Sequence, residues 1–160
     1  MQRIPLTQGK EALVDDQDYE YLTQWKWYAA KMGKGFYALR CVWQSGKQRT
    51  VLMHREIAVR AGWTGRRVDH RDRNGLNNQR SNLRLASVTQ NIVNRGLQRN
   101  NTSGAVGVHW LQACEKWRAR VRAGGRSFQR DFNGFDEAVA WRDAKAKELH
   151  GEFAYLNGAA

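Results

Sequence analysis

The stretch VDHRDRNGLNNQRSNLRLASVTQN, residues 68–91, decides the fold of the middle of the chain. Two short runs that contain apolar residues, 66–70 and 83–86, predict strands, and the Asp-, Asn- and Gly-rich residues between them predict a long loop. Ser87 is followed three residues later by Gln90, which matches a capping box and predicts a helix from Ser87 to about Arg95. The expected order is therefore strand, long loop, strand, helix.

Four polar residues of this stretch could meet in such a unit, because the end of the first strand can face the first turn of the helix. Hydrolysis of a phosphodiester needs a base that activates water and a cation that neutralises charge on the leaving oxygen. We expect Asp69 and Asn91 to share a cation such as magnesium, which prefers oxygen ligands, with His70 beside it as the base. Asn82 could accept the other imidazole N–H and fix the tautomer. The alternative is that Asp69 and Asn82 are turn and cap residues of a degenerate nuclease that only binds DNA.

The spacing of these residues resembles that of the HNH (ββα-metal) endonucleases of phages and group I introns. The resemblance is carried by Asp69-His70, by Asn82-Leu83-Arg84 and by Asn91, and the pair Asn77-Asn78 in the loop also fits. It implies that His70 is the general base, that Asp69 and Asn91 bind one divalent cation (Mg2+ or Mn2+), and that Asn82 orients the base. The products implied are a 5′-phosphate and a 3′-hydroxyl.

A second histidine, His54, lies in the run Met53-His54-Arg55, and a similar run precedes the HNH unit of phage relatives. It falls at a junction between a predicted strand (49–53) and a predicted short helix (54–61), which suits a hydrogen-bonded structural histidine. We interpret His54 in that way, and a chemical role is the alternative. Further strands are expected at 36–43, joined to 49–53 by a turn at Ser45-Gly46-Lys47, and 15–27 could hold a short helix and a strand.

The last third of the chain predicts three strands, at 106–111, 116–122 and 127–132, and a helix that starts at Asp136 and ends at Gly151. Arginines alternate with other residues along the second and third strands, so we expect a ribbon with arginine on one face that can enter the major groove of DNA. The other face should pack on the helix through Trp117, Val121, Trp141 and Ala144. The alternative is an ordinary solvated charged face.

This segment resembles the AP-two (ethylene-response-factor) DNA-binding domain, a three-stranded antiparallel sheet on one helix. The resemblance is carried by Gly107-Val108-His109-Trp110, Trp117-Arg118-Ala119, Asp131-Phe132 and Glu137-Ala138. The DNA contacts that it implies are His109, Arg118, Arg120, Arg122, Arg126, Phe128 and Arg130. Plant domains often have Arg at the position of His109 and Trp at that of Phe128, so base preference does not carry over.

Bulk composition narrows the class of partner. The 160 residues carry a net charge of +12, which favours a polyanion such as nucleic acid over a basic protein without such a partner. The two cysteines, Cys41 and Cys114, form no Cys-x-x-Cys pair, so neither a structural zinc nor a disulfide framework is expected. No signal peptide, membrane span or membrane-binding helix is evident, and we expect the cytoplasm of a bacterial or phage-infected cell.

Together these patterns predict an α+β protein in four parts: a small β-rich N-terminal segment (1–53), a ββα-metal HNH nuclease unit (54–97), a linker (98–104) and an AP-two-like DNA-binding domain (105–157). The expected function is a homing-type endonuclease that nicks double-stranded DNA as a monomer or homodimer, with one divalent cation and no small-molecule cofactor. The alternatives are a non-catalytic DNA-binding regulator that uses the C-terminal sheet, and an RNA-binding protein of ribosomal type.

Overall fold

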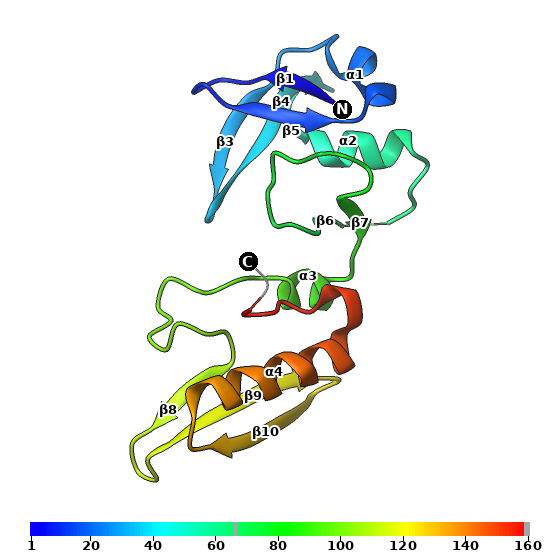
Figure 1. Ribbon diagram of the computed structural model, residues 1–160. Helices are drawn as coiled ribbons and strands as arrows, with labels where there is room; N and C mark the ends of the chain where they lie inside the picture. Colours follow the sequence, from blue (N-terminus) through cyan, green and yellow to red (C-terminus); the bar gives the residue numbers. More distant parts are fainter. Residues whose placement is uncertain (66, 159–160) are drawn as a thin grey trace. The chain divides into compact units, whose positions relative to one another are not determined.

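A computed structural model of the chain describes residues 1–65 and 67–158, which form two compact units, Met1–Val88 and Thr89–Ala160 (Figure 1). Arg66, which the sequence analysis assigns to a strand, lies outside the described residues. Secondary structure is mixed, with helices and several small antiparallel sheets, in agreement with the predicted α+β class. None of the helices in the described ranges combines the length and the apolar character that crossing a lipid bilayer requires.

In its described residues, 1–65 and 67–88, the first unit contains three small antiparallel sheets and two complete helices. Its elements are β1 (Gln2–Pro5), β2 (Glu11–Val14), α1 (Asp16–Leu22), β3 (Tyr28–Met32), β4 (Gly35–Gln44), β5 (Lys47–Leu52), α2 (Met53–Arg60), β6 (Val68–His70) and β7 (Leu83–Leu85). Strands β1 and β2 pair with each other, β4 lies between β3 and β5, and β6 pairs with β7. The predicted hairpin, the helix after it and the two strands around the long loop are therefore all present.

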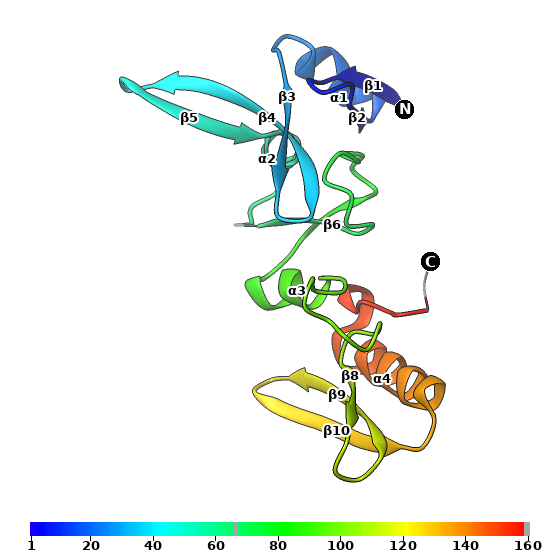
Figure 2. The ribbon, with the colours of Figure 1, turned by 90° about the vertical axis from the view of Figure 1, so that its left-hand side faces the viewer.

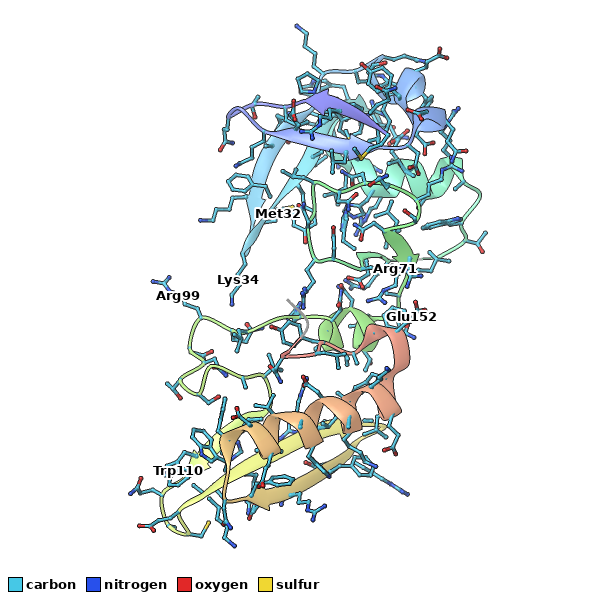
Figure 3. The ribbon with its side chains drawn as sticks, in the orientation of Figure 1. Met32, Lys34, Arg71, Arg99, Trp110 and Glu152 are labelled. Atoms are coloured by element: carbon cyan, nitrogen blue, oxygen red, sulfur yellow. The ribbon has the colours of Figure 1, made fainter. Side chains whose placement is uncertain are left out.

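Strand β4 is long enough to take part in two hairpins in succession. Its first half, up to Leu39, pairs with β3, and its second half pairs with β5. The turn into β5 is formed by Ser45 and Gly46, whose φ angles of 53° and 70° are those of a type I′ turn, the turn that matches the twist of the flanking strands. Met32 and Lys34 mark the end of the other hairpin (Figure 3).

One hydrophobic core holds the first unit together. Its buried side chains come from the predicted N-terminal segment and from the predicted nuclease segment alike: Ile4, Ala12, Val14, Leu22, Trp27, Ala38, Met53, Ile57 and Leu83. The indole N–H of Trp27 donates to the carbonyl of Leu22 at 2.8 Å, so even the polar atom of this large side chain is satisfied. The compact units of the structure divide after Val88.

The second unit is a three-stranded antiparallel sheet packed against one long helix, as predicted. After α3 (Val88–Val93), which begins at the unit boundary, come β8 (Val108–Leu111), β9 (Lys116–Ala123), β10 (Arg126–Phe132), α4 (Phe135–His150) and the short 3-10 helix η1 (Gly151–Phe153). The sheet order is β10-β9-β8, and Trp110 lies near the end of β8 (Figure 3). Gly124 and Gly125 have positive φ and form the two-residue turn between β9 and β10.

Helix α4 buries a narrow stripe of small side chains. Ala138 and Ala146 are fully buried, and Ala138 belongs to a core with Ala105, Val108 and Ala119. The prediction that Ala144 faces the sheet is wrong, because Ala144 is exposed and Arg142 is the buried residue of that turn. Its guanidinium donates to Asp143 at 2.8 Å and to the carbonyl oxygen of Tyr155, which allows a charged residue to occupy this position.

Candidate active site and nucleic-acid interface

Asp69 and His70 occupy consecutive positions of strand β6, which pairs with β7. Asp69 lies opposite Arg84 and His70 lies opposite Leu83 in the antiparallel pair, and both Asp69 and His70 are buried. The Nε and Nη2 groups of Arg84 donate to Asp69 Oδ2 at 3.0 and 2.9 Å. The pair is almost fully removed from solvent, so the guanidinium fixes the orientation of this carboxylate and balances its charge.

The imidazole of His70 is positioned by Asn78. His70 Nε2 lies 3.3 Å from Asn78 Oδ1, and Asn78 itself is completely buried. Because an amide oxygen only accepts hydrogen bonds, this contact places the proton on Nε2 and the lone pair on Nδ1. The sequence pattern contained Asn78 in the Asn77-Asn78 pair but did not single it out as the partner of the histidine.

Asn78 is held in turn by the N-terminal strand β2. The backbone N–H of Asn78 donates to the carbonyl of Leu13 at 2.8 Å, and the N–H of Leu13 donates to the carbonyl of Leu76 at 2.8 Å. Asn77 and Leu13 thereby form a short parallel bridge between the loop and β2. The N-terminal segment therefore supports the geometry at His70, a role that the sequence did not reveal.

Asn82 ties together the loop between β6 and β7. Its Nδ2 donates to Asp72 Oδ1 at 2.9 Å and to the carbonyl of Asn77 at 2.8 Å, and its Oδ1 accepts the backbone N–H of Asp72 at 3.1 Å. These bonds connect the start of the loop with its end. The role in orienting His70 that the sequence assigns to Asn82 stays a prediction, and in this structure Asn78 makes the hydrogen bond to His70.

His54 and Tyr37 enclose His70 in a cluster of three rings. The ring centroids of His54 and His70 are 4.8 Å apart and nearly perpendicular, and Tyr37 lies 5.9 Å from His54 and 5.8 Å from His70. His54 is buried at the start of α2, directly after β5. The position that we interpreted as structural therefore lies against the predicted base, and the only signal for this in the sequence was the Met53-His54-Arg55 run.

Burial favours the neutral form of both imidazoles. Desolvation, followed by the nearby charges of His70 and Arg55, lowers the pKa of His54 from 6.5 to about 3. Desolvation also lowers the pKa of His70, although the hydrogen bond to Asn78 and the carboxylates of Asp72 and Asp69 act in the opposite direction. A neutral imidazole is the form that can accept a proton.

We predict that the first unit loses stability as the pH falls through the range in which His54 would titrate. The pKa of this imidazole is 6.5 in the unfolded state and about 3 in the folded state. As the pH falls below 6.5 the unfolded state therefore binds a proton that the folded state does not, and the free energy of unfolding decreases. This amounts to roughly 2 kcal/mol by pH 5. Urea unfolding of His54→Gln, followed by tryptophan fluorescence from neutral pH to pH 5, should show a shallower loss than the wild type. His109→Gln, in the second unit, is the matched control, and equal slopes for all three proteins would contradict the prediction.

Gly75 lets the loop pack against the ring cluster. A Cβ atom at this position would lie 2.5 Å from the carbonyl oxygen of Phe36 and 2.6 Å from the ring of Tyr37. Such a contact with backbone cannot be relieved by a side-chain rotation. The loop from Asp72 to Asn78 therefore requires glycine at this point in order to lie on β4.

The sequence pattern assigns Asp69 to a site for one oxygen-preferring cation. Over residues 1–65 and 67–158 no three His, Cys, Asp or Glu side chains lie together as a metal cluster. Asp69 supplies a single carboxylate, whose Oδ2 is already held by Arg84, and Asn91 lies on α3 in the second unit. A cation bound here would take most of its ligands from water and phosphate, as magnesium does in many of its protein sites.

The register of β9 and β10 corrects the predicted arginine face of the second unit. Arg118, Arg120 and Arg122 lie opposite Asp131, Gln129 and Ser127, whereas Arg126, Phe128 and Arg130 lie opposite Ala123, Val121 and Ala119. Residues directly opposite each other project from the same face of a sheet. The two arginine sets are therefore on opposite faces, and the prediction of one arginine-bearing face for both strands is wrong.

Phe128, Arg126 and Arg130 share the face that carries the buried Ala119 and Val121. The ammonium of Lys145, on α4, lies 5.2 Å from the centre of the Phe128 ring, which confirms that this is the helix side. On the other face, His109 lies opposite Arg118, and Arg118 donates two hydrogen bonds of 2.7 and 2.8 Å to Asp131. Arg120 and Arg122 remain exposed on that helix-free face.

Two viral proteins are similar to this chain. The chain is 43% identical over 89 residues to Protein 3.8 of Escherichia phage T7. The match covers 54% of the chain and 72% of that protein. The chain belongs to the family of Protein 3.8. The name Protein 3.8 states no activity, so membership of this family does not indicate which reaction the chain catalyses.

The other relative is an uncharacterised HNH endonuclease of Acanthamoeba polyphaga mimivirus. It is 29% identical over 156 residues, which are 93% of the chain and 75% of that protein. This distant similarity supports a relation of the chain to HNH proteins. No family model matches the chain, and no solved structure matches it.

Proposed function

We propose that this protein is a divalent-metal-dependent HNH endonuclease that hydrolyses one strand of double-stranded DNA at a time. The observation that carries the proposal is the environment of His70: a buried, neutral imidazole whose Nε2 donates to Asn78 and whose neighbour in sequence is the carboxylate of Asp69. Similarity over most of the chain to a viral HNH endonuclease supports it, and the net charge of +12 suits a DNA substrate.

In the proposed reaction His70 Nδ1 accepts a proton from a water molecule as the water oxygen attacks phosphorus. A new P–O bond forms, the bond between phosphorus and the 3′ oxygen breaks, and the leaving oxygen takes a proton from solvent. The products are a 5′-phosphate and a 3′-hydroxyl. Asn78 holds the imidazole in the tautomer that this step needs, and the packing of Tyr37 and His54 limits its rotation.

Asp69 and Asn91 would hold the cation, which supplies neutralisation of the negative charge on the leaving oxygen. Arg84 keeps the Asp69 carboxylate oriented before the cation and the DNA bind. One such set of residues occurs in the chain, so a single molecule is proposed to nick rather than to cut both strands. A double cut would require a dimer or two successive events.

Conversion of supercoiled plasmid to open circles tests the proposal. We expect nicking in magnesium or manganese and none in EDTA, with ends that DNA ligase can reseal because a 5′-phosphate lies next to a 3′-hydroxyl. Plasmid that stays supercoiled with every divalent metal and with natural phage or bacterial DNA as target would reject the nuclease. If the protein then binds the same DNA equally well with and without EDTA, a DNA-binding regulator is favoured. The ion pair between Asp69 and Arg84 supports this alternative, because it occupies the carboxylate that a cation would need.

The helix-free face of the second unit is proposed to set where the protein sits on DNA. The substitutions Arg120→Ala and Arg122→Ala together should weaken binding of duplex DNA and reduce the salt dependence of the binding constant by a slope of about two, because each phosphate contact contributes roughly one. Arg126→Ala with Arg130→Ala removes the same charge from the helix side. Fluorescence anisotropy at several salt concentrations compares the pairs, and equal losses would contradict the assignment of the face.

A further inference from the structure

The second half of the β4–β5 hairpin lies outside the core of the first unit. Every residue from 43 to 50 is exposed, and the third strand of the sheet, β3, pairs with β4 only as far as Leu39. Figure 2 shows this hairpin extending away from the rest of the unit. We call residues 41–50 the arm.

The arm exposes a tryptophan. Trp43 is 76% exposed, and it makes no aromatic or cation–π contact with any other residue that the structure describes. The other large aromatic side chains of this unit behave differently: Trp27 is buried, and Trp25 packs against Tyr21 and Arg40. An exposed indole on a hairpin that has no core leaves apolar surface in water, which is unfavourable, and no packing within the chain offsets that free-energy cost.

Charge on the arm has one sign. Between Gly35 and Leu52 the sequence has no acidic residue, and its basic residues are Arg40, Lys47 and Arg49. Arg40 is tied to Glu56 at 3.3 Å, near the base of the hairpin. Lys47 and Arg49 are exposed, and neither makes an ion pair within residues 1–65 and 67–158. The arm therefore offers two uncompensated cations on the same hairpin as an exposed aromatic ring.

The register sets the arrangement of these groups. Trp43 lies opposite Gln48, and the neighbouring pairs are Gln44 with Lys47 and Val42 with Arg49. One face of the ribbon thus carries the indole and an amide, and the other carries the two cations. A ribbon of this width fits the major groove of DNA, where phosphates line both walls and base edges line the floor.

We propose that the arm is a second DNA-contacting element, separate from the sheet of the second unit, and that it enters a groove of the duplex. Lys47 and Arg49 contact phosphates, and Trp43 packs against sugars or a base step. The inference rests on the proposed function only for its substrate, duplex DNA. A protein partner would have to be strongly acidic to match the arm, and a two-stranded ribbon this short gains its stability from whatever covers it.

Binding by a catalytically inactive protein tests the arm without any requirement for cleavage. The probe is a short fluorescein-labelled duplex of mixed sequence, added to His70→Ala in the absence of divalent metal. Trp43→Ala should bind roughly tenfold more weakly than this parent, because the indole surface that packs against sugars or a base step is lost, and Trp43→Phe should retain most of the affinity. Far-ultraviolet circular dichroism checks that each variant is folded.

Lys47→Gln with Arg49→Gln should reduce the slope of the salt dependence by about two, whereas Trp43→Ala should leave that slope unchanged. Lys26→Gln with Lys31→Gln is the matched control, because both lysines are exposed in the same unit. Tryptophan emission that is quenched by the duplex in the parent but not in Trp43→Phe would support the contact directly.

Several outcomes would overturn the inference. The arm is not a DNA element if its variants bind like the parent, or if the Lys26 and Lys31 control loses as much affinity and slope as the arm pair. Equal quenching and affinity with duplex RNA, with single-stranded DNA or with anionic phospholipid vesicles would assign it a different occupant. A wild type that fails to nick plasmid while the arm variants lose DNA affinity would reject the nuclease and leave the arm standing.

Discussion

Replacing His70 with alanine is expected to lower the rate of plasmid nicking by about 10²- to 10⁴-fold, the usual contribution of a general base. The variant removes the nitrogen that accepts the proton from water, but it leaves the carboxylate of Asp69 and its ion pair with Arg84 in place. Binding of duplex DNA should therefore be almost unchanged. The measurement is the initial rate of open-circle formation in magnesium, at an enzyme concentration that saturates the plasmid.

Two further variants, Asn78→Ala and His54→Gln, decide whether the general base is His70 or the adjacent His54. Asn78→Ala keeps the imidazole but removes the acceptor of its Nε2 proton, so we expect an intermediate loss of about 10- to 100-fold. His54→Gln keeps His70 and its partner and should cost less than either. Full activity in His70→Ala, together with an inactive His54→Gln, would transfer the role of base to His54.

The sequence pattern was enough to propose Asp69 and His70 as site residues, but it did not indicate which residues hydrogen-bond to them. Asp69 and His70 are consecutive in the sequence, so their place in one strand follows from the chain itself, but consecutive strand residues project from opposite faces, and adjacency alone does not bring their side chains together. Asn78 and Asn82 lie in a loop whose path depends on β2, through the backbone bonds of Leu13 to the loop. A local sequence pattern cannot indicate which asparagine of this loop contacts His70, because that depends on how the distant strand β2 holds the loop.

The error over the arginine face has a different origin. Alternation along each strand was read correctly, since Ala119 and Val121 are buried and Arg120 and Arg122 are exposed. A two-residue turn pairs even-numbered positions with odd-numbered ones, so arginines at even positions in both strands must project from opposite faces. The turn at Gly124-Gly125 was predicted, and its consequence for the register was available in the sequence.

The hairpin of β1 and β2 was not predicted because its strands are only four residues long and lack a clear alternation. Its apolar residues, Ile4, Ala12 and Val14, are nevertheless among the most buried in the unit. The β-rich N-terminal segment and the strand–loop–strand segment therefore share a core that neither part of the sequence could indicate alone. Tertiary contacts, rather than local propensity, define this half of the fold.

The same dependence predicts a large loss of stability when Arg80 is replaced. Asp18, on α1, is completely buried, and it accepts bonds of 2.7 Å from Arg80 Nε and from Arg80 Nη2. Arg80→Ala should destabilise the first unit by about 3 to 5 kcal/mol, because it leaves a buried carboxylate with only the more distant Arg60, at 3.6 Å. Urea unfolding followed by tryptophan fluorescence measures the loss.

The two partners are not equivalent, and this asymmetry provides the control. The side chain of Arg80 is 27% exposed whereas that of Asp18 is fully buried, so Asp18→Ala leaves a cation that can still reach water. We expect Asp18→Ala to cost less than Arg80→Ala, and the double variant to cost less than Arg80→Ala alone. Arg80 also anchors the end of the loop that carries Asn78, since its backbone N–H donates to Asp15 at 2.8 Å. Single losses that simply add in the double variant would show that the buried charge is not what makes Arg80 important.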